Sequence, residues 1–179
     1  MKNVLILSGS PRRGGNSDLL CDAFGAGAAE AGNAVEKIFV RDQKIGYCNA
    51  CYGCRKTGKC VIKDDMAKVL EKMHWADVIV MASPVYFYSI DAQMKTLIDR
   101  TLAQWTKLEN KEFYYIMTAA EESDTVMDCT LECFRGFAVC LNGSVEKGVL
   151  YGKGVYEAGD VKNTPYLQQA YDMGKGVQQ

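Results

Sequence analysis

The sequence lacks an excess of charge of either sign, and it lacks any long apolar run. With 21 Lys and Arg against 22 Asp and Glu, the formal net charge is −1 and the isoelectric point is near 5.9. Nucleic acids and anionic membrane surfaces bind clustered positive charge, so we expect neither as a partner. A membrane-spanning helix needs about 20 apolar residues, and a signal peptide needs a shorter apolar run before a cleavage site. The sequence shows neither pattern, so we expect a cytoplasmic protein.

Histidine is almost absent, and two common nucleotide-binding fingerprints are missing altogether. The single histidine, His74, falls near the end of an expected helix, where we expect a surface residue rather than a catalyst. No GxGxxG sequence occurs, and no lysine follows the glycines at 14 and 15, which argues against a dinucleotide site and a triphosphate loop. Repeats, linkers and low-complexity tracts are also missing. The 179 residues, 48% of them apolar, therefore predict a single domain over residues 1–179.

Short apolar runs alternate with longer amphipathic stretches along the whole chain. The apolar runs predict strands at 4–8, 35–39, 78–83, 113–118 and 144–152. The amphipathic stretches predict helices at 16–31, 65–75, 91–104, 124–140 and 164–177. We expect Asn16, and Asp64 or Asp65, to cap helix starts and Gly32 to end the first helix. This alternation predicts an α/β fold in three layers, with a five-stranded parallel sheet covered by helices on both faces.

In such a sheet, ligands bind beyond the carboxyl ends of the strands, where the strand order reverses. This rule directs attention to the loops at 8–17, 40–64, 82–90 and 118–124. The first reads SGSPRRGGNS and combines glycines that allow close backbone approach with hydroxyls, two arginines and a helix start. These features predict a cradle for one terminal monophosphate, rather than an ordinary polar turn between a strand and a helix.

The loop after the third strand follows Pro84 and carries three consecutive aromatic residues, Tyr86, Phe87 and Tyr88. A flat heterocycle could lie against them, although aromatic loops also form hydrophobic lids and contacts between subunits. Beside a phosphate cradle on the neighbouring strand, this loop indicates a nucleotide with a planar ring and one phosphate. The apolar run from Tyr86 to Ile90 also predicts a homo-oligomer, either a homodimer or a homotetramer.

Four of the eight cysteines fall within the segment CNACYGCRKTGKC, residues 48–60. Structural disulfides are rare in the cytosol, so this density favours metal binding or redox chemistry. Cys48, Cys51, Cys54 and Cys60 have the spacing C-x2-C-x2-C-x5-C, whose soft sulfur ligands suit a [4Fe–4S] cluster or zinc. Two short intervals that share a cysteine favour the cuboidal cluster over zinc. Empty or redox-active thiols stay open as a third interpretation.

Three further cysteines lie outside this segment, towards the end of the chain. Cys129 and Cys133 are four residues apart, on one face of an expected helix, and Cys140 follows them. We expect all three to be buried core thiols, which is the usual environment of a free cysteine.

Three segments, taken in order, resemble the flavodoxin-like NAD(P)H-dependent FMN reductases: GSPRRGGNS, CNACYGCRKTGKCVIKDDM and ASPVYFYSIDAQMKTLIDR. The cysteine segment is particularly similar to that of the iron–sulfur flavoproteins. The resemblance covers about the first 120 residues and implies a flavodoxin-like three-layer sandwich that binds FMN. It also implies an FMN phosphate site at Ser10, Arg12, Asn16 and Ser17, in a loop shaped by Pro11 and Gly15. Contacts with the isoalloxazine ring are implied for Pro84, Val85, Tyr86, Phe87, Thr118 and Ala119.

A bound flavin would accept hydride from a stacked nicotinamide without an acid or a base, so we assign no catalytic side chain. The leading hypothesis is an FMN-dependent oxidoreductase that takes electrons from NAD(P)H or ferredoxin. Its acceptor would be small, such as a quinone, a nitro compound, free flavin or oxygen, and a cluster would provide a one-electron outlet. Two alternatives are a flavodoxin-like carrier between proteins, against which the near-neutral charge counts, and a thiol or metal sensor.

Overall fold

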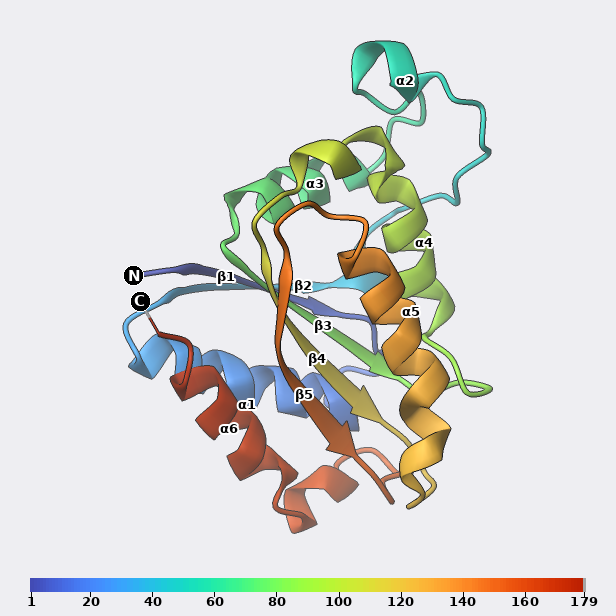
Figure 1. The fold of residues 1–179 in the computed structure, drawn as a ribbon. Coiled ribbons are helices and arrows are strands. Elements are labelled where there is room, and N and C mark those ends of the chain that lie inside the picture. The colour runs from blue at the N-terminus through green and yellow to red at the C-terminus, as the bar shows by residue number, and fades with distance from the viewer. Residues whose placement is uncertain (179) are drawn as a thin grey trace.

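The computed structural model describes residues 1–178 and contains a five-stranded, fully parallel sheet between two layers of helices (Figure 1). The strands are β1 (Asn3–Ser8), β2 (Ala34–Phe39), β3 (Val78–Pro84), β4 (Glu112–Thr118) and β5 (Val145–Gly152). The helices are α1 (Asn16–Glu30), α2 (Cys54–Thr57), α3 (Met66–Trp75), α4 (Ala92–Arg100), α5 (Asp128–Ala138) and α6 (Tyr166–Lys175). Short 3-10 turns span Val40–Asp42, Thr101–Ala103, Trp105–Lys107, Asp124–Met127 and Asp160–Asn163.

The flavodoxin-like α/β sandwich expected from the sequence is therefore confirmed, and each expected strand ends within one residue of its observed bounds. Residue 179, the last of the expected single domain, lies outside the described residues. Within residues 1–178, none of the helices combines the length and the apolar character that a membrane crossing needs.

The strand order β2-β1-β3-β4-β5 reverses between β1 and β3. From β1 the chain passes to β2 on one side, and it then crosses to β3 on the other, so Leu5 pairs with both Glu36 and Ile79. The loops after β1 and β3 consequently leave the sheet side by side. They touch through Gly9, whose backbone N–H donates to the carbonyl of Ala82 at 2.8 Å. A Cβ at Gly9 would lie 2.9 Å from that carbonyl oxygen, so this approach requires glycine.

Both faces of the sheet are buried, with α1 and α6 on one face and α3, α4 and α5 on the other (Figure 1). Successive residues of a strand point to opposite faces, so neighbours on β4 serve different layers. Tyr115 stacks on Phe134 of α5, with ring centroids 5.2 Å apart. Tyr114 meets Phe24 of α1 edge-on, also at 5.2 Å. The two aromatic contacts join the central sheet to both helical layers.

Helices α1 and α6 touch backbone to backbone at Gly27 and Gly174. A Cβ at Gly27 would overlap the carbonyl oxygen of Tyr171 and lie 2.8 Å from the backbone nitrogen of Lys175. A Cβ at Gly174 would lie 3.0 Å from the backbone nitrogen of Ala28. The layer formed by α1 and α6 therefore depends on two residues without side chains.

The observed bounds differ from the expected ones by two residues or more in three helices. Helix α4 ends at Arg100 and continues only as 3-10 turns, α5 spans Asp128–Ala138 and α6 spans Tyr166–Lys175. The short helix α2 was not expected, because its residues belong to the cysteine segment rather than to an amphipathic stretch.

Of the expected helix caps, Asn16 was wrong and the others are confirmed. Gly15 is the N-cap of α1, and Asn16 is already its first helical residue. Before α3, the Asp64 carboxylate accepts from the backbone N–H of Met66 at 3.1 Å, although Asp65 holds the cap position. Gly32 follows α1 with φ of 84°, as a helix-ending glycine should.

The expectation that Cys129, Cys133 and Cys140 are buried is wrong. Cys129 and Cys140 are exposed and Cys133 is half-buried, because α5 turns another face, which includes Phe134, towards the sheet. The buried thiol is Cys21 on α1, and its burial raises its pKa to about 12. A thiol with such a pKa is a poor nucleophile and a poor metal ligand.

Candidate functional site

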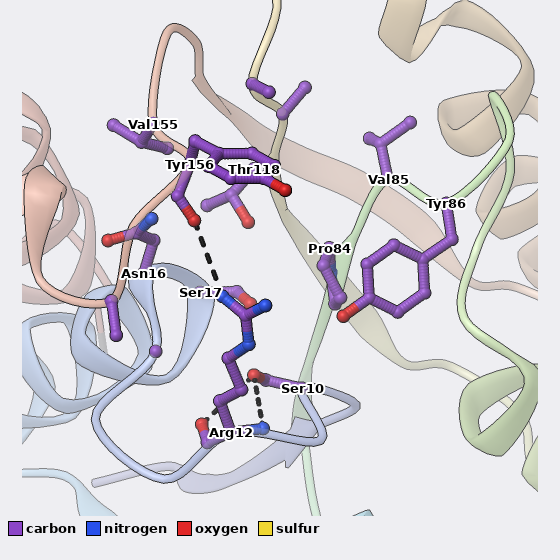
Figure 2. A pocket seen from close by; sticks show the side chains of 14 residues that line it. Ser10, Arg12, Asn16, Ser17, Pro84, Val85, Tyr86, Thr118, Val155 and Tyr156 are labelled. Atoms are coloured by element: carbon purple, nitrogen blue, oxygen red, sulfur yellow. Dashed lines mark hydrogen bonds between the residues drawn. The ribbon is translucent and has the colours of Figure 1, made fainter.

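A pocket of about 160 Å³ opens at the carboxyl edge of the sheet, where the strand order reverses (Figure 2). It is built from the loops that follow β1, β3, β4 and β5. Its walls are formed by Ser10, Arg12, Gly15, Asn16, Ser17, Pro84, Val85, Tyr86, Thr118, Ala119, Ala120, Val155, Tyr156 and Ala158.

The loop after β1 folds into a tight turn that opens the start of α1 towards the pocket. The Ser10 hydroxyl accepts from the backbone N–H of Arg12 and donates to its carbonyl, both at 3.1 Å. The backbone N–H of Gly15 donates to the same carbonyl at 3.1 Å. No side chain caps α1, and the buried Ser17 side chain lines the pocket. An anion placed here would meet the N–H groups of the first helical turn, the Ser17 hydroxyl and the positive end of the helix dipole.

Of the two arginines in this loop, only Arg12 lines the pocket. Its guanidinium crosses the opening, and its Nη1 lies 3.5 Å from the carbonyl oxygen of Tyr156, to which it donates (Figure 2). Arg13 points elsewhere: it pairs with Asp42 and lies over the Phe39 ring, 4.7 Å from its centroid. The pocket therefore presents one cation beside the start of α1.

The rest of the pocket is mostly apolar and sits on rigid strand ends. Val85 donates from its backbone N–H to the carbonyl of Thr118 at 2.8 Å, which fixes the end of β3 against the end of β4. Figure 2 shows the Tyr86 ring turned towards Pro84, and Thr118 and Tyr156 line the same pocket. An opening with one charged end and apolar walls suits a ligand that joins a phosphate to a flat ring.

Ten of the twelve residues expected at FMN line this pocket, and Pro11 and Phe87 do not. The carbonyl of Pro11 instead accepts from Nη1 of Arg41 at 2.6 Å, which pulls it to the outside of the loop. Phe87 is fully exposed at the tip of a tight turn in which Tyr86 and Ser89 pair. Both residues shape their loops without facing the pocket.

The sequence reasoning missed the wall that follows β5, formed by Val155, Tyr156 and Ala158. Asn16, expected as a helix cap, holds this segment instead. Its side-chain oxygen accepts from the backbone N–H groups of Gly159 and Val161 at 3.1 and 3.2 Å. Its amide nitrogen donates to the carbonyl of Glu157 at 2.9 Å. The rule about carboxyl edges applies equally to β5 and could have identified this loop.

A second pocket is lined by all four clustered cysteines and shares no residue with the first. Its walls are formed by Cys48, Asn49, Cys51, Tyr52, Cys54, Cys60, Val61, Ile62, Asp99, Arg100, Leu102 and Ala103. Figure 1 shows α2 projecting beyond α3 and α4, at the end of the molecule opposite to the arrowheads of β4 and β5. The expectation that the loop at 40–64 lines the same crevice as the others is therefore wrong. This loop begins at the carboxyl edge but turns away along α4.

The cysteine segment has an unusual backbone. Ala50 and Tyr52 both have positive φ, 52° and 55°, a conformation that costs a non-glycine residue about 1–2 kcal/mol. All eight cysteines are free thiols. Within residues 1–178, no three His, Cys, Asp or Glu side chains are arranged to hold a metal ion. The four thiols thus share one pocket and suit a soft metal by their chemistry, without forming a ligand set in this structure.

The model of the family described as NADPH-dependent FMN reductase matches residues 2–130, which is most of the chain. The chain belongs to this family. A relative from Methanocaldococcus jannaschii, named iron-sulfur flavoprotein, is 35% identical to this chain. The match covers 97% of this chain and 94% of the relative. Another iron-sulfur flavoprotein, from Archaeoglobus fulgidus, is 43% identical over 57% of this chain. That match spans about half of the Archaeoglobus protein, 46% of its length.

The fold of this FMN reductase family member is also similar to solved structures over nearly its whole length. The NAD(P)H:quinone oxidoreductase from Methanothermobacter marburgensis superposes with a TM-score of 0.77 over 99% of both chains. The two sequences are 18% identical, so this likeness shows a shared fold.

Proposed function

We propose that this protein is a cytoplasmic FMN-dependent oxidoreductase that passes electrons from NAD(P)H or ferredoxin to a small acceptor. Acceptors of the right chemistry are quinones, nitro compounds, free flavin and oxygen. The observation that carries the proposal is the pocket at the reversal of strand order, where one arginine and an uncapped helix start meet apolar walls. A member of an FMN reductase family would place its cofactor there.

In this proposal the phosphate of FMN lies against Ser10, Arg12 and Ser17, and its ring lies between Tyr86 and Thr118. Bound FMN would supply the hydride chemistry, and the protein would bind and orient it. Arginine and two tyrosines are the ionisable side chains of the pocket, and none is placed as an acid or a base. This composition supports a site that works by stacking and positioning rather than by proton transfer.

Replacing Arg12 with alanine should weaken FMN binding about 10- to 150-fold, because a charge-assisted phosphate contact contributes roughly 1.5–3 kcal/mol. Adding Ser10→Ala should weaken binding further. The dissociation constant is measured by the quenching of FMN fluorescence, and mass spectrometry of the released cofactor identifies the flavin.

Arg13→Ala is the matched control, since Arg13 has the same charge in the same loop but lies outside the pocket. It should leave FMN affinity within about twofold of the unmodified protein. Equal effects of the two substitutions, or FAD as the released cofactor, would contradict the proposed site. Bleaching of the yellow protein by NAD(P)H would support the reductase over a flavodoxin-like electron carrier. A protein that stays colourless after reconstitution with FMN would leave a thiol or metal sensor as the remaining hypothesis.

We further propose that Cys48, Cys51, Cys54 and Cys60 hold a [4Fe–4S] cluster that provides a one-electron outlet. Three observations support it: four soft thiols line one pocket, strained residues separate them, and the relatives at 35% and 43% identity are named iron-sulfur flavoproteins. Strained backbone persists only where the surrounding structure holds it in place, and it clusters at functional sites. The alternatives are a zinc ion held by the same cysteines and free thiols that hold no metal, and assays of iron, zinc and acid-labile sulfide distinguish them.

We also propose that the protein assembles into a homodimer or homotetramer through the turn at Tyr86–Ser89. Phe87 is fully exposed and Tyr88 is 55% exposed. Both have positive φ, 49° and 62°, in a two-residue turn that ordinarily selects asparagine and glycine. Exposed aromatic residues held at a conformational cost indicate a contact surface. Within one subunit, the flavin pocket and the cysteine pocket lie at opposite ends of the molecule. Assembly would shorten the path of the electrons if it brought the flavin pocket of one subunit near the cysteine pocket of the next.

Replacing Phe87 with asparagine and Tyr88 with glycine should convert the oligomer to monomers. The new residues suit the turn, so the monomer should not unfold at a lower temperature. Its free energy of unfolding should stay the same or rise by about 1–2 kcal/mol per relieved residue. Light scattering at micromolar concentration gives the mass, and calorimetry gives the melting temperature. Val139→Ser removes an apolar side chain that is 83% exposed elsewhere and should leave the mass unchanged. A monodisperse FMN-bound monomer before any substitution would refute the assembly.

A further inference from the structure

Arg100 is a buried cation at the wall of the cysteine pocket. Its side chain is 1% exposed and closes the last turn of α4. Nη1 donates to the carbonyl of Gly46 at 2.6 Å and to one carboxylate oxygen of Asp64 at 2.7 Å. Nη2 donates to the other oxygen of Asp64 at 3.0 Å. These bonds hold residues near both ends of the cysteine loop against α4.

The clamp to Gly46 and Asp64 uses three of the five N–H groups of the Arg100 guanidinium and leaves Nε–H and one N–H of Nη2 over. Asp64 is satisfied by Arg100 and by the backbone N–H groups of Gly46 and Met66, at 3.0 and 3.1 Å. It occupies the Nη end of the planar group, which leaves the edge with Nε–H uncommitted. Nε is buried and has no hydrogen-bond partner among residues 1–178. A buried N–H left unpaired costs about 1–3 kcal/mol, and more on a charged group.

The unpaired donor belongs to a side chain that shares its pocket with sulfur. Arg100 and all four clustered cysteines line that pocket. An arginine guanidinium does not lose its proton in a protein, so Arg100 is a permanent cation beside thiols that carry negative charge when they bind a metal.

We propose that Arg100 donates a hydrogen bond from Nε–H to a sulfur of the [4Fe–4S] cluster, either the Cys60 thiolate or a bridging sulfide. This inference rests on the proposed cluster. A reduced cluster carries one more negative charge than an oxidised one, so a cationic donor at its sulfur stabilises the reduced form. Arg100 keeps its proton throughout and acts by raising the reduction potential. The clamp to Asp64 holds the guanidinium plane in place.

The test compares Arg100→Lys with Asp64→Asn in full-length protein reconstituted with iron and sulfide without oxygen. Arg100→Lys keeps the positive charge but loses the planar group and its Nε–H, so the midpoint potential should fall. Iron affinity should drop about 10- to 100-fold, as when the partner of a metal ligand is removed. Asp64→Asn keeps Nε–H and removes the countercharge of Arg100, so the potential should rise. A residue that only clamps the loop would shift the potential in one direction in both variants.

A direct readout comes from protein labelled with nitrogen-15 at the arginine Nε positions. Pulsed electron paramagnetic resonance of the reduced cluster should show a nitrogen-15 coupling in unmodified protein that disappears in Arg100→Lys. Arg100 does not line the FMN pocket, so FMN affinity should stay unchanged. An unchanged FMN affinity shows that each variant is folded. Absence of the coupling in unmodified protein, or an unaltered potential in Arg100→Lys, overturns the role of Arg100 while the cluster stands. Unmodified protein that takes up no iron overturns the cluster itself, and with it this inference.

Discussion

Replacing Gly27 with alanine is expected to destabilise the protein by at least about 3 kcal/mol and to lower its melting temperature by roughly 6–12 °C. The added methyl would overlap the carbonyl oxygen of Tyr171 and lie 2.8 Å from the nitrogen of Lys175. Both atoms belong to the backbone of α6, so no side chain can rotate away, and the two helices must separate. Thermal unfolding followed by circular dichroism measures the loss.

Gly136→Ala makes the same chemical change within α5, where a new Cβ has no neighbour within 4 Å. There only helix propensity acts, and alanine should stabilise the protein by about 0.5–1 kcal/mol. The two substitutions should therefore have opposite signs. If Gly27→Ala raised the melting temperature as well, the close backbone contact between α1 and α6 would be absent in solution. FMN affinity should fall in Gly27→Ala, because Asn16 on α1 holds the pocket wall that leads into α6.

The strands could be read from the sequence, but the contact between α1 and α6 could not. A strand buried on both faces leaves a continuous apolar run, so the runs at 4–8 and 113–118 located β1 and β4 within one residue. Gly27, in contrast, looks like a weak point of a helix. Its role depends on Gly174, which is distant in sequence, and no local pattern links the two.

The first pocket was largely readable because its loops are short and begin where the sheet ends. Three loops came from that rule together with the phosphate and aromatic motifs. The segment with Val155 and Tyr156 carries no motif, and its position depends on hydrogen bonds to the Asn16 side chain. A polar residue at a helix start reads as a cap, so a long-range role for Asn16 left no signal in the sequence.

The position of the cysteine pocket was not readable, because the rule locates where a loop begins and not where a long loop goes. The segment that follows β2 runs along α4, where Arg100 fastens it. In the sequence, Arg100 looks like an ordinary basic residue in the last turn of a helix, where a cation complements the helix dipole. Its burial and its unpaired Nε are visible only in the folded chain.

Replacing Cys54 with serine is expected to reduce the iron content from about four atoms per chain to background. A serine hydroxyl stays protonated and is too hard a ligand to replace a thiolate in such a cluster. FMN should remain bound, because the cysteine pocket and the flavin pocket share no residue. Iron and acid-labile sulfide are assayed in protein reconstituted without oxygen, which would otherwise oxidise an exposed cluster. Electron transfer to one-electron acceptors should fall, while bleaching of the flavin by NAD(P)H should persist.

Cys129→Ser is the matched control, since Cys129 is an exposed thiol that does not line the cysteine pocket. It should leave the iron content and the one-electron activity unchanged. Zinc in place of iron would establish a closed structural site and remove the one-electron outlet. No metal in anaerobic protein, or equal iron in both variants, would leave Cys48, Cys51, Cys54 and Cys60 as thiols. In that case the protein would be a flavin reductase in which these four cysteines hold no metal, and the proposed FMN pocket would stand unchanged.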